Sequence, residues 1–149
     1  MPEVRFYQLG RPPLGEALGT MLERPLERGQ RAVVLAGSEE RVEALAQQLW
    51  TYAERSFLPH GTARDGMAER QPVWLTAQEG NPNGAEVLFL LDGQQSERLD
   101  SYALVALLFD GGDPERLAAA RAQWTALKAA GHALTYWAED AQGKWQKRA

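Results

Sequence analysis

Aromatic and basic side chains gather at two places in this 149-residue sequence. Residues 50–61 (WTYAERSFLPHG) hold three aromatics, a proline and one of the two histidines. Large aromatics in a connecting segment either pack onto the core or line a binding cleft, because most connections lie on the surface and are polar. The second place lies near the C-terminus, where Arg121, Trp124 and Lys128 recur at helical spacing.

On a helix that turns 100° per residue, Arg121, Trp124 and Lys128 would lie within roughly 60° of one another. This mixture of basic and aromatic groups fits a ligand with a carboxylate and an apolar side chain, such as a short acidic peptide ending in an aromatic residue. Arg121 would bind the carboxylate and Trp124 would wall the side-chain pocket. The alternative is a helix whose Arg and Lys stems extend over the rim of the core.

Motifs for catalysis or cofactor binding are absent from the sequence. It has no cysteine for a thiolate zinc site or nucleophile, and no serine in a G-x-S-x-G turn. His60 and His132 do not have the spacing of a metal-binding pair. The glycine-containing turns at 36–40 and 110–115 place carboxylates where a phosphate would bind. We therefore expect a protein that is not an enzyme and needs no cofactor or metal. The alternative is a small α/β hydrolase or nucleotide-sensing domain that uses His60 and nearby carboxylates.

Composition fits one soluble globular domain over residues 1–149. The net charge of −4 argues against binding of duplex nucleic acid, which needs several cations for phosphate contacts. The longest apolar run, residues 103–109, is far shorter than the roughly 20 residues of a membrane-spanning helix. We expect a cytoplasmic protein with no membrane contact.

Apolar runs alternate with helical patterns along the chain, which predicts an α/β fold with a mostly parallel sheet. The expected strands cover residues 4–9, 31–36, 72–76, 87–91, 103–109 and 132–137. The first helix should start near residue 14 and end or kink at Pro25, the second should follow Ser38 as N-cap, and the third should follow Asp113 as N-cap. The core-facing arc of the third helix is expected to contain Ala119, Ala120, Ala126, Leu127 and Ala130.

Short segments spread along nearly the whole chain resemble the chi subunit of bacterial DNA polymerase III. The resembling residues are Phe6-Tyr7, Leu49-Trp50, Ser56 to Gly61, Gln71-Pro72-Val73, Asn83-Gly84-Ala85, Leu108 to Gly111, Ala120-Arg121, Trp124, Lys128, Gly131-His132 and Tyr136-Trp137. The resemblance implies a single Rossmann-like α/β domain, a mostly parallel sheet flanked by helices, with no nucleotide-binding motif. It also implies a non-catalytic accessory subunit of the clamp-loader assembly.

The resemblance further implies the partners. The family grips the acidic, phenylalanine-ended C-terminal tail of single-stranded DNA-binding protein and links it to the polymerase, so DNA is reached only indirectly. Carried onto this sequence, the tail-binding residues are Trp50, Phe57, Arg121, Trp124 and Lys128. Some family members have lysine where Thr125 stands, so this chain lacks one cation there.

The family's second partner is the small psi subunit, where an organism has one. No residue of this sequence is assigned to that interface by the resemblance. Exposed apolar positions near residues 102–107 are the first place to look.

Overall fold

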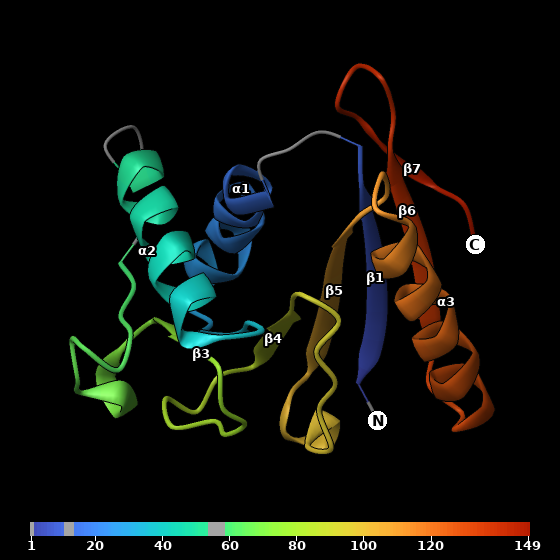
Figure 1. Cartoon of the computed structure of the whole chain (residues 1–149). Coiled ribbons are helices and arrows are strands. Elements are labelled where there is room, and N and C mark those ends of the chain that lie inside the picture. The colour runs from blue at the N-terminus through green and yellow to red at the C-terminus, as the bar shows by residue number, and fades with distance from the viewer. Residues whose placement is uncertain (1, 11–13, 54–58) are drawn as a thin grey trace.

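A seven-stranded sheet in the order β3-β2-β4-β5-β1-β6-β7 runs through the protein (Figure 1). The structure, a computed structural model, describes residues 2–10, 14–53 and 59–149. All neighbouring strands are parallel except β6 and β7. The strands are β1 (Glu3–Leu9), β2 (Ala32–Leu35), β3 (Val73–Thr76), β4 (Val87–Leu90), β5 (Leu104–Asp110), β6 (Leu134–Glu139) and β7 (Trp145–Lys147). The helices are α1 (Leu14–Glu27), α2 (Glu39–Ala53) and α3 (Pro114–Ala129), with short 3-10 helices at Ala68–Arg70 and Leu99–Ser101. The predicted α/β class with a mostly parallel sheet is confirmed.

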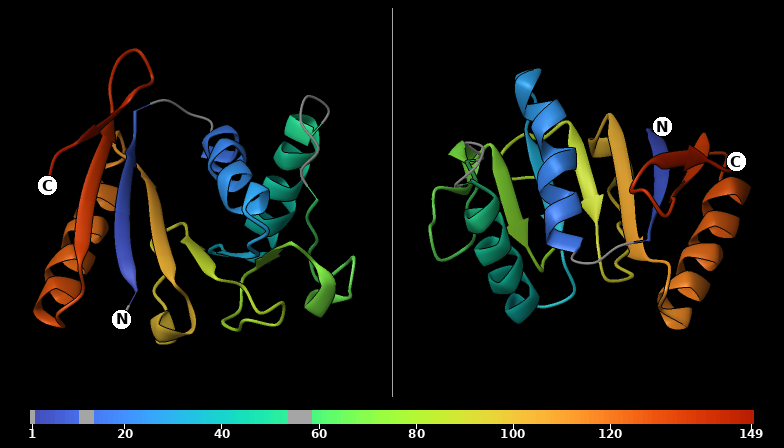
Figure 2. Two further views of the ribbon diagram at one scale, coloured as in Figure 1. Left: turned by 180° about the vertical axis from the view of Figure 1, so that it is seen from behind. Right: turned by 90° about the horizontal axis from the view of Figure 1, so that it is seen from above.

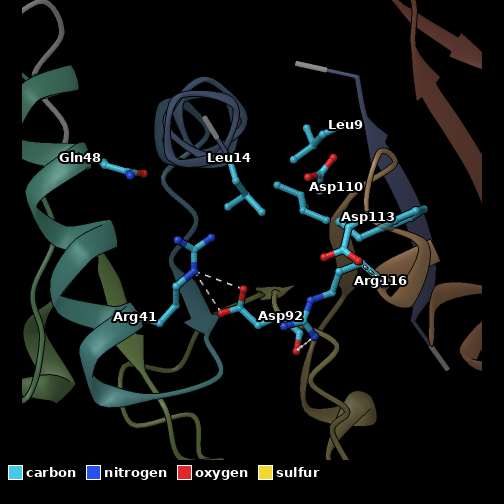
Figure 3. A pocket seen from close by; sticks show the side chains of 10 residues that line it. Leu9, Leu14, Arg41, Gln48, Asp92, Asp110, Asp113 and Arg116 are labelled. Atoms are coloured by element: carbon cyan, nitrogen blue, oxygen red, sulfur yellow. Dashed lines mark hydrogen bonds and ion pairs between the residues drawn. The ribbon is translucent and has the colours of Figure 1, made fainter. Parts of the chain in front are cut away.

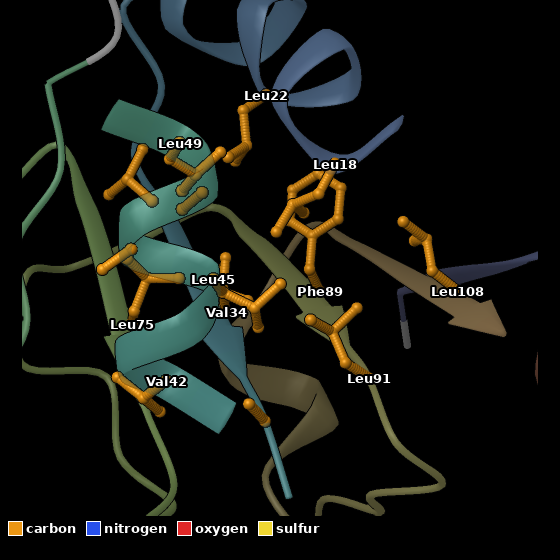
Figure 4. Close-up of a cluster of buried hydrophobic side chains, with 14 of the residues drawn as sticks. Leu18, Leu22, Val34, Val42, Leu45, Leu49, Leu75, Phe89, Leu91 and Leu108 are labelled. Carbon is orange, nitrogen blue, oxygen red and sulfur yellow. The ribbon is translucent and has the colours of Figure 1, made fainter. Parts of the chain in front are cut away.

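Helices cover the two faces of the sheet at opposite ends (Figure 2). Leu18 and Leu22 of α1 pack with Leu45 and Leu49 of α2 over β2, β3 and β4, in the cluster that Figure 4 shows. Helix α3 packs on the other face, against Phe6 of β1 and other residues of β5 and β6. Every residue of β2 and β4 is buried, as expected for parallel strands enclosed on both sides.

Side-chain caps start two of the helices as the sequence predicts. Ser38 Oγ accepts a hydrogen bond from the backbone N–H of Arg41 at 3.1 Å, just before the body of α2. Asp113 Oδ1 accepts from the backbone N–H groups of Glu115 and Arg116 at 3.0 and 3.4 Å. Both caps satisfy amide donors that a helix N-terminus leaves unpaired.

The end of α1 differs from the prediction, because the helix continues through Pro25 to Glu27. Proline removes one amide donor, but Pro25 lies in the last turn, where few further bonds depend on it. Its ring is buried against the sheet, and its carbonyl accepts from the N–H groups of Arg28 and Gln30 at 3.1 and 2.9 Å. Burial and these two bonds offset the missing donor.

The core-facing side of α3 matches the predicted arc only in part. Ala120 and Leu127 face the core as predicted, but Ala126 and Ala130 are exposed, and Leu117 and Trp124 also pack against the sheet. The helix is rotated so that its large side chains face the core, which removes more apolar area from water than an alanine stripe would.

Two further predictions were wrong because the residues concerned pair or pack with distant parts of the chain. Strand β7 lies beyond the last expected strand, and it forms because it pairs with β6 and brings the Trp145 ring onto Tyr7, with ring centroids 5.2 Å apart. The segment 102–107 is not an exposed apolar patch, since Tyr102 is 6% exposed and Val105 is fully buried. Among the described residues, no helix is long and apolar enough to cross a membrane.

Candidate functional site

An aromatic wall lies between α3 and the sheet. The Trp124 ring meets Phe6 edge-to-face, with centroids 5.3 Å apart, and meets Tyr136 of β6 in the same way at 5.8 Å. Phe109 at the end of β5 packs on Tyr136 as well, at 6.1 Å. Such perpendicular pairs are favourable arrangements of aromatic rings. Trp124 remains partly exposed, so the wall has one side towards solvent.

Arg121 stands at the edge of this wall. Its side chain is exposed on α3 one turn before Trp124. Lys128 is exposed one turn after Trp124, so the three residues share one flank of the helix. Burial raises the pKa of Tyr136, and the positive charge of the nearby Arg121 opposes that rise. Tyr136 donates a hydrogen bond to Gln8 of β1.

Two features position α3 and its flank. The Asp113 cap fixes where the helix begins, and Gln123, which is 7% exposed, donates to the carbonyl oxygens of Gly93 and Gln94 at 3.4 and 3.3 Å. Thr125 turns back and donates to the carbonyl of Arg121 at 3.1 Å. The flank therefore presents an exposed guanidinium, a group suited to carboxylates, beside an aromatic wall.

The predicted site residues do not all lie together. Trp50 is in the last turn of α2 and packs against His60 with the ring planes tilted by 59° and the centroids 4.9 Å apart, beyond the β3 edge of the sheet. Trp124 contacts β6, which is five strands away from β3, or about 24 Å at normal strand spacing, and on the other face. Figure 2 shows α2 and α3 at opposite ends of the sheet. Phe57 lies outside the described residues.

Tyr136 lies in the aromatic wall, although the sequence did not assign it to the candidate site. Trp137 is its neighbour, and strand periodicity alone allows either residue to face α3. Packing selects Tyr136 because Phe6, directly opposite it in β1, belongs to the face that α3 covers.

The crevice at the carboxyl ends of the strands is where open α/β sheets bind nucleotides. Here it has a volume of about 320 Å³ and is lined by Arg41, Asp92, Asp113 and Arg116, among others (Figure 3). The carboxylate of Asp92 accepts from the backbone N–H of Gly37 at 3.0 Å and from Arg41 Nε at 3.2 Å. This carboxylate occupies the helix N-terminal position that a phosphate would take, so a nucleotide would have to displace it.

His60 packs against the Trp50 ring, a group that cannot relay a proton. Within the described ranges, no three or more His, Cys, Asp or Glu side chains are placed to hold a metal ion.

Together, these features define a doubly covered parallel α/β protein whose usual nucleotide crevice holds its own carboxylate and whose exposed flank suits an acidic ligand. The chain belongs to the family described as "DNA polymerase III chi subunit, HolC", whose family model matches residues 1–135. It is similar to a probable DNA polymerase III subunit chi from Rickettsia prowazekii (strain Madrid E), with 29% identity over 91 residues. That alignment covers 61% of this chain and 55% of the relative. The family places the chain among the proteins of DNA replication.

Proposed function

We propose that this protein is a non-catalytic accessory subunit that binds the acidic, phenylalanine-ended C-terminal tail of single-stranded DNA-binding protein. The site is the α3 flank formed by Arg121, Trp124 and Lys128, together with Tyr136. The observation that carries the proposal is an exposed guanidinium at the edge of a half-open aromatic wall. Arg121 binds the terminal carboxylate as a bidentate fork, and the terminal ring packs on Trp124.

The positive charges on the α3 flank support this assignment, whereas the net charge of the protein does not. The protein carries a net charge of −4, so long-range attraction does not bring an acidic peptide to it. Arg121 and Lys128 provide two cations on one flank, and Thr125 stands between them where a third would reinforce the site. Tail binding should therefore be weak, geometry-dependent and sensitive to salt.

A linking subunit also needs a second surface for the polymerase side. Trp50 is 60% exposed and lies on a different face from the α3 flank, and large exposed aromatics are frequent anchors of protein interfaces. We therefore remove Trp50 from the tail site and place it in a separate contact, with the psi subunit or the clamp loader as its partner.

Titration with an acidic peptide ending in Pro-Phe, followed by tryptophan fluorescence, tests the tail site. Arg121→Ala should weaken binding by about 1.5–3 kcal/mol, or roughly 10- to 150-fold, the usual loss for a charged hydrogen bond. Arg121→Lys should recover only part of it, because an ammonium cannot form the bidentate fork. The same peptide with a C-terminal amide should bind wild type about as poorly as the acid form binds Arg121→Ala.

Arg70→Ala is the matched control, because it removes an exposed cation from the 3-10 helix Ala68–Arg70, far from α3 in the sheet order. It should change peptide affinity by less than about twofold at 0.1 M salt, where charges beyond the Debye length are screened. Equal losses from Arg121→Ala and Arg70→Ala, or no peptide binding up to about 1 mM, would reject the site.

A further inference from the structure

One half of the sheet carries no helix on the side of α1. Phe6 and Val105 face α3, so their neighbours Arg5 and Tyr7 in β1 point to the opposite face. Tyr7 lies beside Trp137 in the β1–β6 register, which puts Trp137 on that face too. The C-terminal hairpin then adds Trp145 and Lys147, which are opposite Glu139 and Trp137 in β6. The result is a sheet surface with three aromatic rings.

A groove of about 430 Å³ lies between this surface and α1. Arg24 of α1, Arg28 just after this helix and Arg5 of β1 line it together with Tyr7 and Trp145. Val87 and Phe89 form part of its floor, so the groove is basic at its rim and apolar at its base.

Two of the three arginines are available for a ligand. Arg5 makes an ion pair with Glu3, with Nε–Oε1 and Nη2–Oε2 distances of 3.1 and 3.3 Å. Arg24 and Arg28 are exposed, and in the described part of the chain no acidic side chain is within ion-pair distance of either. Arg24 is in the last turn of α1 and Arg28 is the first residue after the helix, so the two can meet neighbouring charges of an extended anion.

The rings are arranged to receive flat groups. Tyr7 and Trp145 meet edge-to-face, with centroids 5.2 Å apart and planes at 73°. In such a pair the ring that offers its edge keeps its own faces clear of its partner. Both side chains are partly exposed at the groove. Aromatic rings on an open sheet beside arginines are the elements by which proteins stack unpaired bases and hold the phosphates between them.

We propose that the groove between α1 and the β1–β6–β7 surface binds single-stranded nucleic acid, with Arg24 and Arg28 on the phosphates and Tyr7 and Trp145 stacked on bases. Duplex is excluded because its bases are already stacked and paired and do not reach the rings. An acidic peptide with one terminal aromatic residue would use the arginines but would place a planar group on only one of the rings. This site does not depend on the proposed tail site, which is on the opposite face of the sheet.

The test uses the full chain and a fluorescein-labelled oligothymidylate of twelve nucleotides, followed by anisotropy at 50 mM salt. Binding is expected with a Kd on the order of 10⁻⁶ to 10⁻⁴ M, and a duplex of the same length should bind at least about tenfold more weakly. The double variant Arg24→Ala/Arg28→Ala should lose about tenfold or more. It should also lower the slope of log affinity against log salt by about 1.4, because each phosphate contact on a single strand contributes about 0.7.

Matched variants distinguish binding in the groove from attraction by positive charge elsewhere on the protein. Arg70→Ala/Arg98→Ala removes the same charge from exposed positions outside the groove and should change affinity by less than about twofold. Trp145→Ala should weaken binding about fivefold or more, and Trp145→Phe should recover most of the loss, since a phenyl ring still stacks. Thermal unfolding of each variant checks that the fold is retained.

Several results would overturn the proposal. These are no binding below about 1 mM, equal losses in the two double variants, or duplex affinity equal to that of the single strand. If an acidic peptide competes with the oligonucleotide and is itself weakened by Arg24→Ala/Arg28→Ala, the groove is a peptide site and the proposal also fails. Arg121→Ala distinguishes the two sites, because it should weaken the Pro-Phe peptide and leave the oligonucleotide unaffected. Loss of one binding activity without the other therefore rejects only one proposal.

Discussion

Asp92 has a left-handed backbone conformation, with φ of +57°, immediately after β4. The conformation is uncommon for residues other than glycine, although Asp and Asn tolerate it best. Hydrogen bonds hold it, because the carboxylate accepts from Gly37 and Arg41, and the Asp92 carbonyl accepts from Arg116 Nη1 at 2.7 Å. Asp92 thus joins the ends of β2 and β4 to the start of α2 through its carboxylate and to the start of α3 through its backbone carbonyl.

Asp92→Ala should lower the free energy of unfolding by about 2–3 kcal/mol, since it removes charged hydrogen bonds and replaces a residue that tolerates positive φ with one that tolerates it less well. Urea denaturation would measure the change. Asp92→Asn is the control, because it keeps an acceptor oxygen and tolerates the conformation, and it should lose less than half as much. A loss below about 0.5 kcal/mol in the alanine variant would show that the carboxylate does not hold these elements together.

For single residues, hydrogen bonds to nearby backbone groups were predictable from the sequence, whereas contacts with residues far away in the chain were not. Asp113 and Ser38 were predicted as caps because their function depends on amides two or three residues away. The burial of Gln123 was not predictable, since its acceptors Gly93 and Gln94 are about thirty residues away in a loop. Tyr136 was not predicted for the same reason, because the packing of α3 determines which face of β6 joins the aromatic wall.

At the scale of elements, α1 and α2 approach each other closely at Gly15. A β-carbon there would lie 1.8 Å from Gln48 Oε1 and 2.8 Å from Gln48 Cβ, well inside van der Waals contact. Glycine is required because the two helices cross with only a side chain of α2 between them. This close packing was not evident from a sequence pattern that placed Gly15 merely near the start of a helix.

Gly15→Ala should destabilise the protein by about 1–3 kcal/mol, the usual cost of overpacking, despite the better helix propensity of alanine. Adding Gln48→Ala should recover part of this loss, because the clashing amide is removed while the β-carbon contact remains. Thermal unfolding of the single and double variants would measure the coupling. Glu16→Ala, at an exposed neighbouring position, should change stability by less than about 0.5 kcal/mol; if Gly15→Ala does the same, the helices can separate without cost.

Element identity was predictable from sequence because apolar runs and helical periodicity are local signals. Strand β7 and the rotation of α3 were not, for a shared physical reason. A three-residue strand with one tryptophan gains its stability from pairing with β6 and from the Tyr7 ring. The alanine-rich α3 has a weak apolar preference of its own, so Leu117, Trp124 and Leu127 determine its orientation only once the sheet is present.

At the scale of the whole molecule, the stability should fall in strong alkali. Burial, assisted by the negative charge of Glu79, raises the pKa of Tyr102 to about 12, and burial raises the pKa of Tyr136 as well. The folded state therefore holds these protons more tightly than the unfolded chain, whose tyrosines titrate near pH 10. The stabilisation is complete below pH 10 and is lost as pH rises through 12.

Melting temperatures measured between pH 9 and pH 12 should therefore drop more steeply in wild type than in Tyr102→Phe, which has no proton to lose. The variant starts from a slightly lower stability, because it lacks the hydrogen bond from the hydroxyl to the Gly80 carbonyl at 3.3 Å. Parallel pH curves for the two proteins would mean that Tyr102 does not couple folding to alkali.

Trp50 and Trp124 lie at opposite ends of the sheet, so each can contact a different partner. Trp50→Ala should leave the affinity for the Pro-Phe peptide within about twofold and stability within about 0.5 kcal/mol, since this ring is 60% exposed at the far end of the sheet. Trp124→Ala should impair both, because its ring packs on Phe6 and Tyr136 and also forms the wall of the tail site. Peptide titration and urea unfolding on the two variants measure this contrast. A large loss of peptide affinity in Trp50→Ala would mean that one ligand spans both faces. If the affinity holds while binding of a polymerase-side partner is lost, the protein carries its two partners on separate surfaces, as a linking subunit must.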